Sequence, residues 1–402
     1  MPRKTGRALL VLLALTLLLP ACASTTKKRY VPQDLAVYHN NEGVKQLAKG
    51  NFEKALWEFK TAAELDAFYP EAHSNLGLIY KYRNEYARAA EEFEIAAKLD
   101  PKWATPHNHL GAVLLSTEKP DLAVVHFKKA TRLDKKFADA YYNLGLAYLD
   151  LAESGEHSRR NTRRAIRAFQ KSTQIDPRLY NAHIDLADTY RKVADWEKAI
   201  LRYRLAIETK QDDPAPWQKL GDLYLEKGDP ARAEECFANA RRLSPQSSEA
   251  LLASGESLVA QRRYFDAVAR FKQILLFDPK NANAWFDLGY TYGLQGNHQD
   301  ATLSYKKAIE IDPDFTRAHY NLGTIYLATE NFSGAEQAFK EALRTSPSHG
   351  PSLYDLGYLY DQTGNSKEAA HYFCQFVKTA AKEFPDEVRL ARGKIKQLGG
   401  CP

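Results

Sequence analysis

The sequence predicts an all-α fold in which about ten helical hairpins stack in a row. Three observations predict it, and they share one period. First, glycine recurs at a constant step, as from Gly43 to Gly77 and from Gly77 to Gly111. Second, an alanine follows each of these positions at a fixed distance. Third, an aromatic residue follows that alanine one helical turn later. Self-similarity at such a period is typical of solenoids, because a single hairpin cannot bury its apolar face and needs its neighbours.

We number each unit from the residue seven places before its glycine, which makes the glycine position 8. The glycines are Gly43, Gly77, Gly111, Gly145, Gly221, Gly255, Gly289, Gly323 and Gly357, and Ala187 takes this place in the fifth unit. Position 20 is alanine in all ten units, and position 24 is always aromatic, from Phe59 to Phe373. We expect the small residues to let helices A and B of one hairpin cross closely. The ring at position 24 is expected to fill the gap toward the next hairpin.

This pattern resembles the tetratricopeptide repeat over about residues 36–383. The resemblance implies a right-handed α-solenoid of about ten such hairpins, and residues 384–402 are expected to form a capping helix and a tail. An insertion of eight residues lies at about 152–161, between the two helices of the fourth unit. In the ninth unit, Ser333 followed by Glu336 predicts a capping box at the start of helix B.

The N-terminal segment has the layout of an export signal. Basic Arg3, Lys4 and Arg7 precede an apolar run, 8–19, which is too short to span a bilayer. The run ends in Leu19-Pro20-Ala21-Cys22, which resembles the lipobox of bacterial lipoproteins, although proline replaces the usual small residue. We therefore expect residues 1–21 to be a lipoprotein signal peptide.

Cleavage before Cys22 would leave this cysteine acylated, with residues 22–35 as a polar tether. Because Ala23 rather than aspartate follows the cysteine, the resemblance implies the periplasmic face of the outer membrane. An ordinary signal peptide, cut near Ala21 or Ala23, is the alternative.

Catalytic and cofactor motifs are missing from the sequence, so we expect neither an enzyme nor a cofactor. Five of the eleven histidines occupy position 4, where other units carry tyrosine or tryptophan, and we expect them to pack rather than to bind metal: His39, His73, His107, His183 and His319. The net charge of +6 would fall to about +3 without the signal peptide, which gives no reason to expect nucleic acid as a partner. Cys236, Cys374 and Cys401 are expected to be free thiols, with pairing of the last two as the alternative.

The A helices of this family line a concave groove, so the resemblance implies a peptide-binding surface there. Position 6 carries side chains that can pair with an extended peptide backbone: Asn41, Asn75, Asn143, Asp185, Asp287, Asn321 and Asp355. Aromatic side chains are expected to add exposed contact area: Tyr142, Phe286, Tyr290, Tyr320, Tyr354 and Tyr358. Simple solvation of an open surface, and core packing of some rings, are the alternatives.

The insertion ends in a basic segment that contains Arg159, Arg160, Arg163 and Arg164. Positive charge at the start of a helix opposes the helix dipole, which favours an acidic or anionic partner. An exposed loop that is only solvated is the alternative.

Together these features predict an outer-membrane lipoprotein scaffold that binds proteins during assembly of an envelope machine. Lipid-anchored repeat proteins of this kind resemble the type IV pilus pilotins, which act on a secretin. A periplasmic adaptor that recruits a protease or cell-wall hydrolase is the alternative.

Overall fold

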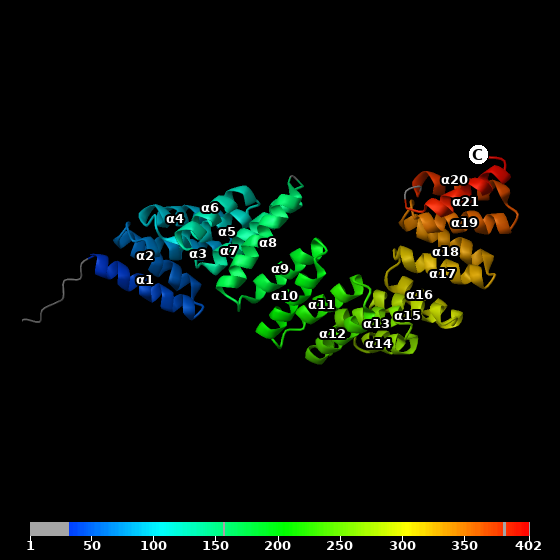
Figure 1. Ribbon diagram of the computed structural model, residues 1–402, viewed down its shortest axis with the longest axis horizontal. Coiled ribbons are helices and arrows are strands. Elements are labelled where there is room, and N and C mark those ends of the chain that lie inside the picture. Colours follow the sequence, from blue (N-terminus) through cyan, green and yellow to red (C-terminus); the bar gives the residue numbers. More distant parts are fainter. Residues whose placement is uncertain (1–31, 156, 381–382, 402) are drawn as a thin grey trace, which may run out of the picture. The chain divides into compact units, whose positions relative to one another are not determined.

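The computed structural model describes residues 32–155, 157–380 and 383–401. Within these residues 21 helices follow one another without a strand (Figure 1). The expected signal peptide, Cys22 and Ala23 lie outside the described residues. None of the described helices has the length and apolar character needed to cross a membrane. The predicted all-α class is therefore confirmed.

Ten helical hairpins and one final helix make up the described chain. The A helices are α1 (Pro32–Ala48), α3 (Pro70–Tyr82), α5 (Ala104–Ser116), α7 (Ala138–Glu153), α9 (Tyr180–Lys192), α11 (Ala215–Glu226), α13 (Ser248–Ala260), α15 (Ala282–Leu294), α17 (Thr316–Ala328) and α19 (Gly350–Gln362). The B helices are α2 (Phe52–Leu65), α4 (Tyr86–Leu99), α6 (Pro120–Leu133), α8 (Ser158–Ile175), α10 (Trp196–Thr209), α12 (Pro230–Leu243), α14 (Tyr264–Phe277), α16 (His298–Ile311), α18 (Phe332–Thr345) and α20 (Ser366–Thr379). The final helix α21 (Pro385–Gln397) covers nearly the range expected for the capping helix. The first helix starts at Pro32, inside the range expected for the tether.

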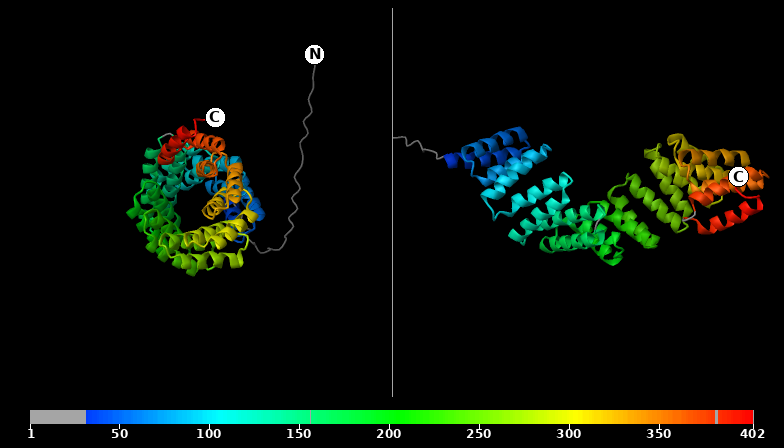
Figure 2. Two further views of the ribbon diagram at one scale, coloured as in Figure 1. Left: turned by 90° about the vertical axis from the view of Figure 1, so that its right-hand side faces the viewer. Right: turned by 90° about the horizontal axis from the view of Figure 1, so that it is seen from above.

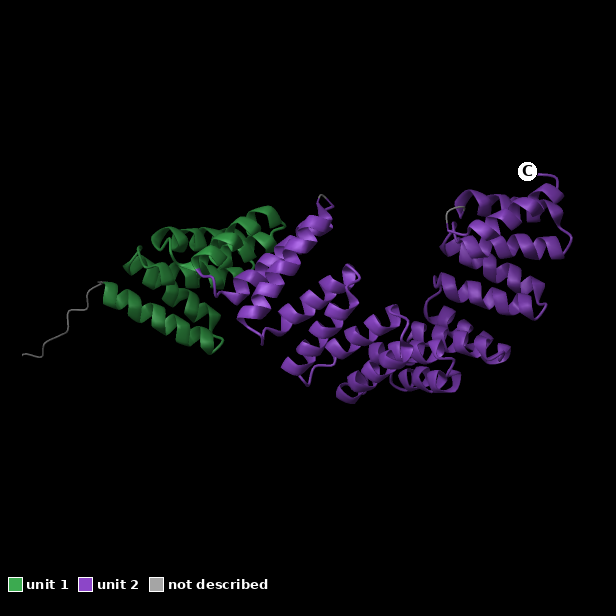
Figure 3. Ribbon diagram, viewed as in Figure 1, with its two compact units in different colours: residues 1–133 green, residues 134–402 purple. Residues whose placement is uncertain are grey.

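The chain divides into two compact units, residues 1–133 and 134–402 (Figure 3). The first unit contains helices α1 to α6, and the second contains α7 to α21. Within each unit, the two helices of a hairpin contact each other, and each B helix contacts the first helix that follows it, as two further views also show (Figure 2). Each unit is therefore a stack whose core is continuous from hairpin to hairpin.

The glycine at position 8 is explained by the aromatic ring of its own hairpin. A Cβ atom added at any of the nine glycines would lie 2.3–2.9 Å from a carbon of the ring at position 24. These rings are at most 2% exposed, from Phe59 to Phe373. The ring therefore occupies the space that the missing glycine side chain leaves open in its own hairpin. It also reaches the next hairpin, as predicted, where the Phe93 ring lies 5.0 Å from the His109 ring.

The turn between helices A and B depends on one left-handed residue in most hairpins. Gly50 and Gly364 adopt φ values of 75° and 79°, which glycine reaches at little cost. Glu330 adopts φ 58° at the same register position. Its amide donates to the Leu327 carbonyl, and the Asn331 amide donates to the Tyr326 carbonyl. This pattern closes the end of α17 in the manner of a Schellman motif.

The predicted capping box of the ninth unit is wrong. Asn331 is the N-cap of α18, and its side chain accepts a hydrogen bond from the Gly334 amide at 3.1 Å. The Ser333 hydroxyl donates to the Asn331 side chain instead. Asparagine is among the best N-cap residues, and it stands one residue before the helix, whereas Ser333 already lies inside the first turn.

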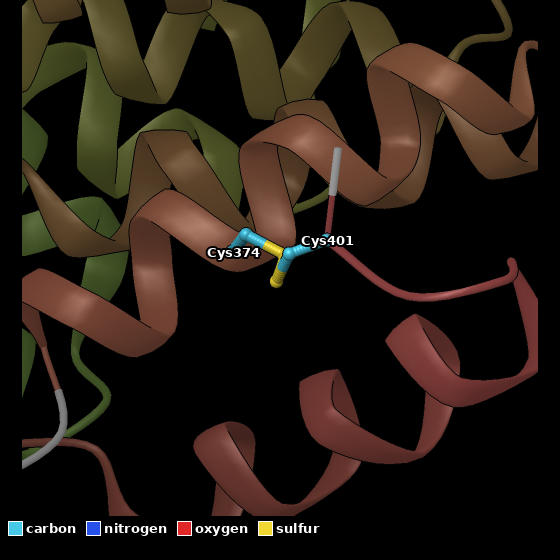
Figure 4. Close-up of a disulfide and its surroundings, with 2 residues drawn as sticks. All are labelled: Cys374 and Cys401. Carbon is cyan, nitrogen blue, oxygen red and sulfur yellow. A yellow bond between two sulfur atoms is a disulfide. The ribbon is translucent and has the colours of Figure 1, made fainter.

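The C-terminal end of the second unit is closed by α21 and a disulfide. Val388 and Ala391 of α21 are buried in one apolar cluster with Phe376 and Ala380. Cys374 of α20 forms a disulfide with Cys401, which follows α21, with Cα atoms 5.9 Å apart (Figure 4). The expectation of free thiols was therefore wrong for this pair, because α21 folds back along α20. Cys236 is a buried free cysteine, as expected.

Candidate functional site

The candidate site is the face that the A helices present away from the B helices, which we call the A-helix face. In the second unit, the A helices α11, α13, α15, α17 and α19 contact one another in sequence. Near its start this face is hollowed by a cavity of about 500 Å³ that α7, α9 and α11 line together. Charged side chains dominate its walls: Asp185, Asp188, Arg191, Lys192, Lys219 and Glu226.

Side chains at position 6 form hydrogen bonds that connect successive hairpins. In the first unit, the Asn75 amide donates to the Asn40 side chain at 2.8 Å. In the second unit, the Tyr142 hydroxyl donates to Asp185 at 2.8 Å. Both bonds join position 5 of one hairpin to position 6 of the next. These polar side chains therefore help to fix the spacing of the stack, in addition to any contact with a peptide.

The same pattern continues toward the C-terminus with one variation. Tyr320, at position 5, donates its hydroxyl to Asp355, at position 6 of the next hairpin. The eighth hairpin carries Phe286 at position 5, which has no hydroxyl. There the Asn321 amide donates to the Tyr305 hydroxyl at 3.3 Å instead. A polar side chain at position 6 thus finds a partner in the preceding hairpin in each of these cases.

A network of ion pairs surrounds the cavity of the A-helix face. Lys219 forms an ion pair with Asp188 at 2.9 Å, and Asp188 also accepts a hydrogen bond from the buried Tyr203. The Arg191 guanidinium donates to Glu226. These charges are paired across neighbouring hairpins, so they link α9 to α11 and leave this part of the surface close to neutral.

Two carboxyl groups farther along the face have strongly raised pKa values. Burial raises the pKa of Asp287 to about 7, with a further increase from the charge of Glu256 and an opposing effect of Arg317. Burial also raises the pKa of Asp355 to about 6, against the hydrogen bond from Tyr320. At neutral pH Asp287 is therefore about half protonated and can donate as well as accept, whereas Asp355 is mostly ionised and accepts.

The first unit presents a less polar version of this face. Asn41 is exposed on α1, whereas Asn75 is partly buried. Position 6 of the third hairpin is His109, whose ring lies 5.0 Å from the ring of Phe93. Burial lowers the pKa of His109 to about 4, with a smaller effect from the Lys81 charge, so the ring is neutral at physiological pH.

The aromatic residues expected in the groove divide into two groups. Tyr290 and Tyr358 are 45% and 41% exposed and can meet a partner. Phe286 is only 7% exposed, because it stacks on Phe315 and lies under the Arg317 guanidinium. The expectation that Phe286 is an exposed contact residue was therefore wrong.

The remaining three tyrosines are partly buried. Tyr142 contributes its hydroxyl to Asp185, and Tyr320 and Tyr354 pack against the C-terminal apolar cluster. Their faces toward solvent are accordingly small. The role of these tyrosines in peptide binding, and that of the polar side chains at position 6, stays a prediction.

The basic residues of the insertion lie at the start of α8. Arg159, Arg160 and Arg163 are exposed. Arg164 lies over the Tyr148 ring, with its guanidinium carbon 5.5 Å from the ring centre. The insertion therefore lengthens the α7–α8 hairpin and does not contribute to the charged cavity described above.

Four of the five histidines at position 4 are packing residues, as expected, whereas His39 on the first helix is partly exposed and pairs with Glu58. His73, His107, His183 and His319 are at most 9% exposed. The rings of His183 and His319 donate to the carbonyl groups of Pro177 and Pro313, six residues earlier, at 3.0 and 2.9 Å. Trp285 does the same to Pro279. At these positions the ring N–H satisfies a carbonyl of the preceding loop. No metal-binding group of side chains occurs in the described part of the chain.

A row of acidic side chains at position 9 also belongs to this face and was not predicted. Asp188, Asp222 and Glu256 occupy this place in three consecutive hairpins. Burial raises the pKa of Asp222, and Glu256 contributes to the raised pKa of Asp287. The repeat register contained the signal, because all three residues follow from the same numbering.

Four family models match parts of the chain, and some of the matched ranges overlap. Models described as TPR repeat or tetratricopeptide repeat match residues 46–82, 70–103, 115–151, 294–330 and 320–384. The middle TPR-like domain of cilia and flagella-associated protein 70 matches residues 183–310. The matches therefore recur along both units of the chain.

Individual relatives share the repeat but little more. Superkiller protein 3 of Schizosaccharomyces pombe is 28% identical over 123 residues, which are 29% of this chain and only 9% of that protein. The structure of PilF from Pseudomonas aeruginosa is 22% identical, covers 55% of this chain and 96% of its own, and gives a TM-score of 0.47. PilW, described as a type IV pilus biogenesis factor, is 20% identical, covers 53% of this chain and 98% of its own, and also gives 0.47.

Period, hairpin geometry and the glycine–ring contact thus agree with the matches to several repeat models. The chain belongs to the tetratricopeptide-repeat family.

Proposed function

We propose that this chain is a lipid-anchored, non-enzymatic scaffold on the periplasmic face of a bacterial outer membrane. Its A-helix face would hold an extended segment of a partner protein during assembly of an envelope machine. The sequence Leu19-Pro20-Ala21-Cys22, placed at the end of the apolar run 8–19, carries this proposal. Two or more acyl chains on Cys22 would give a stable anchor, whereas one chain alone binds a membrane only marginally.

The disulfide supports a location outside the cytoplasm. Cys374 and Cys401 join the last hairpin to the tail behind α21. Disulfides persist in oxidising compartments such as the bacterial periplasm and are rare in the reducing cytosol. An exported chain is therefore the context in which this bond would form and last.

The A-helix face supports the binding of an extended segment. Protein binding is the general role of tetratricopeptide-repeat scaffolds, and this face combines hydrogen-bonding side chains with the exposed rings of Tyr290 and Tyr358. Exposed tyrosines give large contact area at low entropic cost. Among envelope machines we favour the type IV pilus and its secretin, because the signal sequence and repeats resemble those of the pilotin lipoproteins.

Fractionation of cells tests the anchor. In the Cys22→Ser variant, which cannot be acylated, the protein should move from the outer-membrane fraction to the soluble fraction. Ser24→Ala is the matched control, since it changes a nearby small residue and leaves the cysteine in place. If Cys22→Ser remains in the membrane fraction as fully as the control, the lipid anchor is refuted.

Photo-crosslinking in intact cells tests the partner. A photoreactive amino acid replaces Tyr290 or Tyr358 on the A-helix face, and Phe265 serves as the control because it is 87% exposed on the B helix α14. We expect the first two positions to capture one envelope protein, such as a secretin, that the control does not capture. Equal capture from all three positions would contradict binding at the A-helix face.

Deletion of the gene separates the two envelope pathways. Loss of extended pili would support the pilus assignment. Normal pili combined with an altered cell shape would refute it in favour of an adaptor for a protease or cell-wall hydrolase.

A further inference from the structure

A second cavity lies at the inserted turn of the fourth hairpin, beside the cavity of the A-helix face, with which it shares Leu149 and Lys192. Helices α7 and α8 contain 16 and 18 residues, whereas the next hairpin has 13 and 14. The extra residues add about one helical turn, or roughly 6 Å, to the tip of the hairpin. The lengthened tip extends past the neighbouring turn between α9 and α10 (Figure 1).

The difference in length between the α7–α8 and α9–α10 hairpins leaves a cavity that we call the insertion pocket. Its volume is about 540 Å³, which lies in the range of sites that hold small ligands or a few side chains. Apolar side chains form part of its wall, namely Leu149, Ala152, Ile166 and Val193. Val193 is 48% exposed, so apolar surface is open to a partner.

The rim of the insertion pocket is positively charged. Among its described lining residues, Arg159, Arg163 and Lys192 are basic and Glu153 is acidic, so these residues carry a net charge of +2. Lys192 already forms an ion pair with Glu153 at 2.9 Å. The two arginines therefore supply the charge that a partner would meet.

The arginines belong to a helix without compensating acids. Helix α8 contains five arginines, one lysine and no acidic residue. Within the described residues, which omit position 156, no carboxylate lies within ion-pair distance of Arg159 or Arg163, whereas Arg191 on the next hairpin is paired with Glu226. Like charges four residues apart and positive charge at a helix start both destabilise a helix. A bound anion would relieve both effects.

The neighbouring apolar wall selects among anionic partners. A flat lipid surface or a nucleic-acid backbone would meet the exposed arginines but would leave Leu149, Ile166 and Val193 without a contact. A peptide with carboxylates beside an apolar side chain matches both parts of the surface. We propose that the insertion pocket binds an acidic segment of a partner protein, with its carboxylates on Arg159 and Arg163 and an apolar side chain against Val193.

This site adjoins the cavity of the A-helix face and would add to its affinity when one partner reaches both. Exposed ion pairs are weak, with each worth at most about a fivefold change in affinity. We therefore expect loss of both arginines to weaken binding by about tenfold. Binding should also weaken with rising salt, because exposed charges are screened.

The probe is a fluorescein-labelled peptide of eight residues that alternates glutamate and leucine. Fluorescence anisotropy with the purified full chain measures its binding at low and at moderate salt. Arg159→Gln/Arg163→Gln should reduce affinity about tenfold, and Val193→Asp should also reduce it. The control Arg242→Gln/Arg392→Gln removes two exposed arginines elsewhere and should leave affinity unchanged. Circular dichroism verifies that each variant is folded.

Three results would overturn the proposal. The first is an equal loss of affinity in the two double variants, which would indicate only a general effect of net charge. The second is unchanged binding by a peptide with alanine in place of leucine, which would remove the role of the apolar wall. The third is binding to phosphatidylglycerol vesicles or to duplex DNA that depends on Arg159 and Arg163 and is stronger than binding to the peptide. A tenfold loss confined to the pocket variants, with preference for the leucine-containing peptide, would support it.

Discussion

Replacement of Gly323 by alanine tests the contact that defines each hairpin. A Cβ atom at this position would lie 2.5 Å from Cε1 and 2.6 Å from Cδ1 of Phe339. Carbon atoms in contact normally lie about 3.5–4.0 Å apart, so the new methyl group overlaps the ring by about 1 Å. The Phe339 ring is fully buried and cannot turn away without displacing its neighbours.

Two opposing effects determine how much Gly323→Ala changes the free energy of unfolding. Alanine favours a helix over glycine by about 1 kcal/mol. Overpacking of a tight core costs about 1–3 kcal/mol, and the upper part of this range applies where the ring is enclosed. We therefore expect Gly323→Ala to lower the free energy of unfolding by about 2 kcal/mol. Gly393→Ala is the matched control on α21, where no atom lies within 4 Å of the added Cβ, and it should stabilise by about 0.5–1 kcal/mol.

Native-state hydrogen exchange is the suitable assay, because long repeat arrays need not unfold in a single step. Amides of α17 and α18 should exchange faster in Gly323→Ala, and slower exchange in α21 should mark the control. In Gly323→Ala/Phe339→Leu the smaller side chain relieves the overlap, so the two changes should cost less than their sum. The reasoning is refuted if Gly323→Ala is as stable as the original protein, or if the double variant shows no relief.

Three further predictions concern other parts of the second unit. The pKa of Asp287 is raised from 3.8 to about 7 in the folded chain. Between these two pH values the folded state therefore binds more protons than the unfolded state. The free energy of unfolding should accordingly fall as the pH rises from about 4 to about 7. Asp287→Asn should flatten that decline in urea titrations from pH 4 to pH 8, and an unchanged slope would exclude this carboxyl as its source. Cys401→Ser removes the disulfide to Cys374, which spans 27 residues, and should destabilise α20 and α21 by about 2–4 kcal/mol. Equal protease resistance of these helices in the variant and the original protein would contradict this. Glu330→Gly should stabilise its turn by up to about 1 kcal/mol, because its φ of 58° suits glycine, and a lower melting temperature would disprove the strain.

The hairpins could be predicted from sequence because their pattern is local and repeated. Glycine at position 8, alanine at position 20 and a ring at position 24 keep the same spacing in nearly every unit. Any one of these residues would be weak evidence for a hairpin, but ten units in the same register leave few other folds compatible with the sequence. The same register correctly placed four of the five histidines of position 4 in the core, because that position carries large aromatic rings in other units.

The candidate site could be predicted only in part. Register indicated which side chains belong to the A-helix face, but exposure along that face depends on the neighbours of each residue. Phe286 is buried because Phe315, the N-cap of α17, and Arg317 in α17 cover it, whereas Tyr290, one turn later on the same helix as Phe286, stays 45% exposed. The sequence positions of these residues are equally compatible with either outcome.

The sequence by itself determined the helical repeat, the number of hairpins and the location of the insertion. Those properties follow from short-range spacing, in which each residue acts on partners within its own hairpin. Only the tertiary structure decided that Cys374 meets Cys401, that Asp287 loses enough solvent to raise its pKa, and that the inserted turn leaves a pocket beside Val193. These features depend on how one hairpin packs on the next, because burial and distance between segments are properties of the stack and not of the repeat.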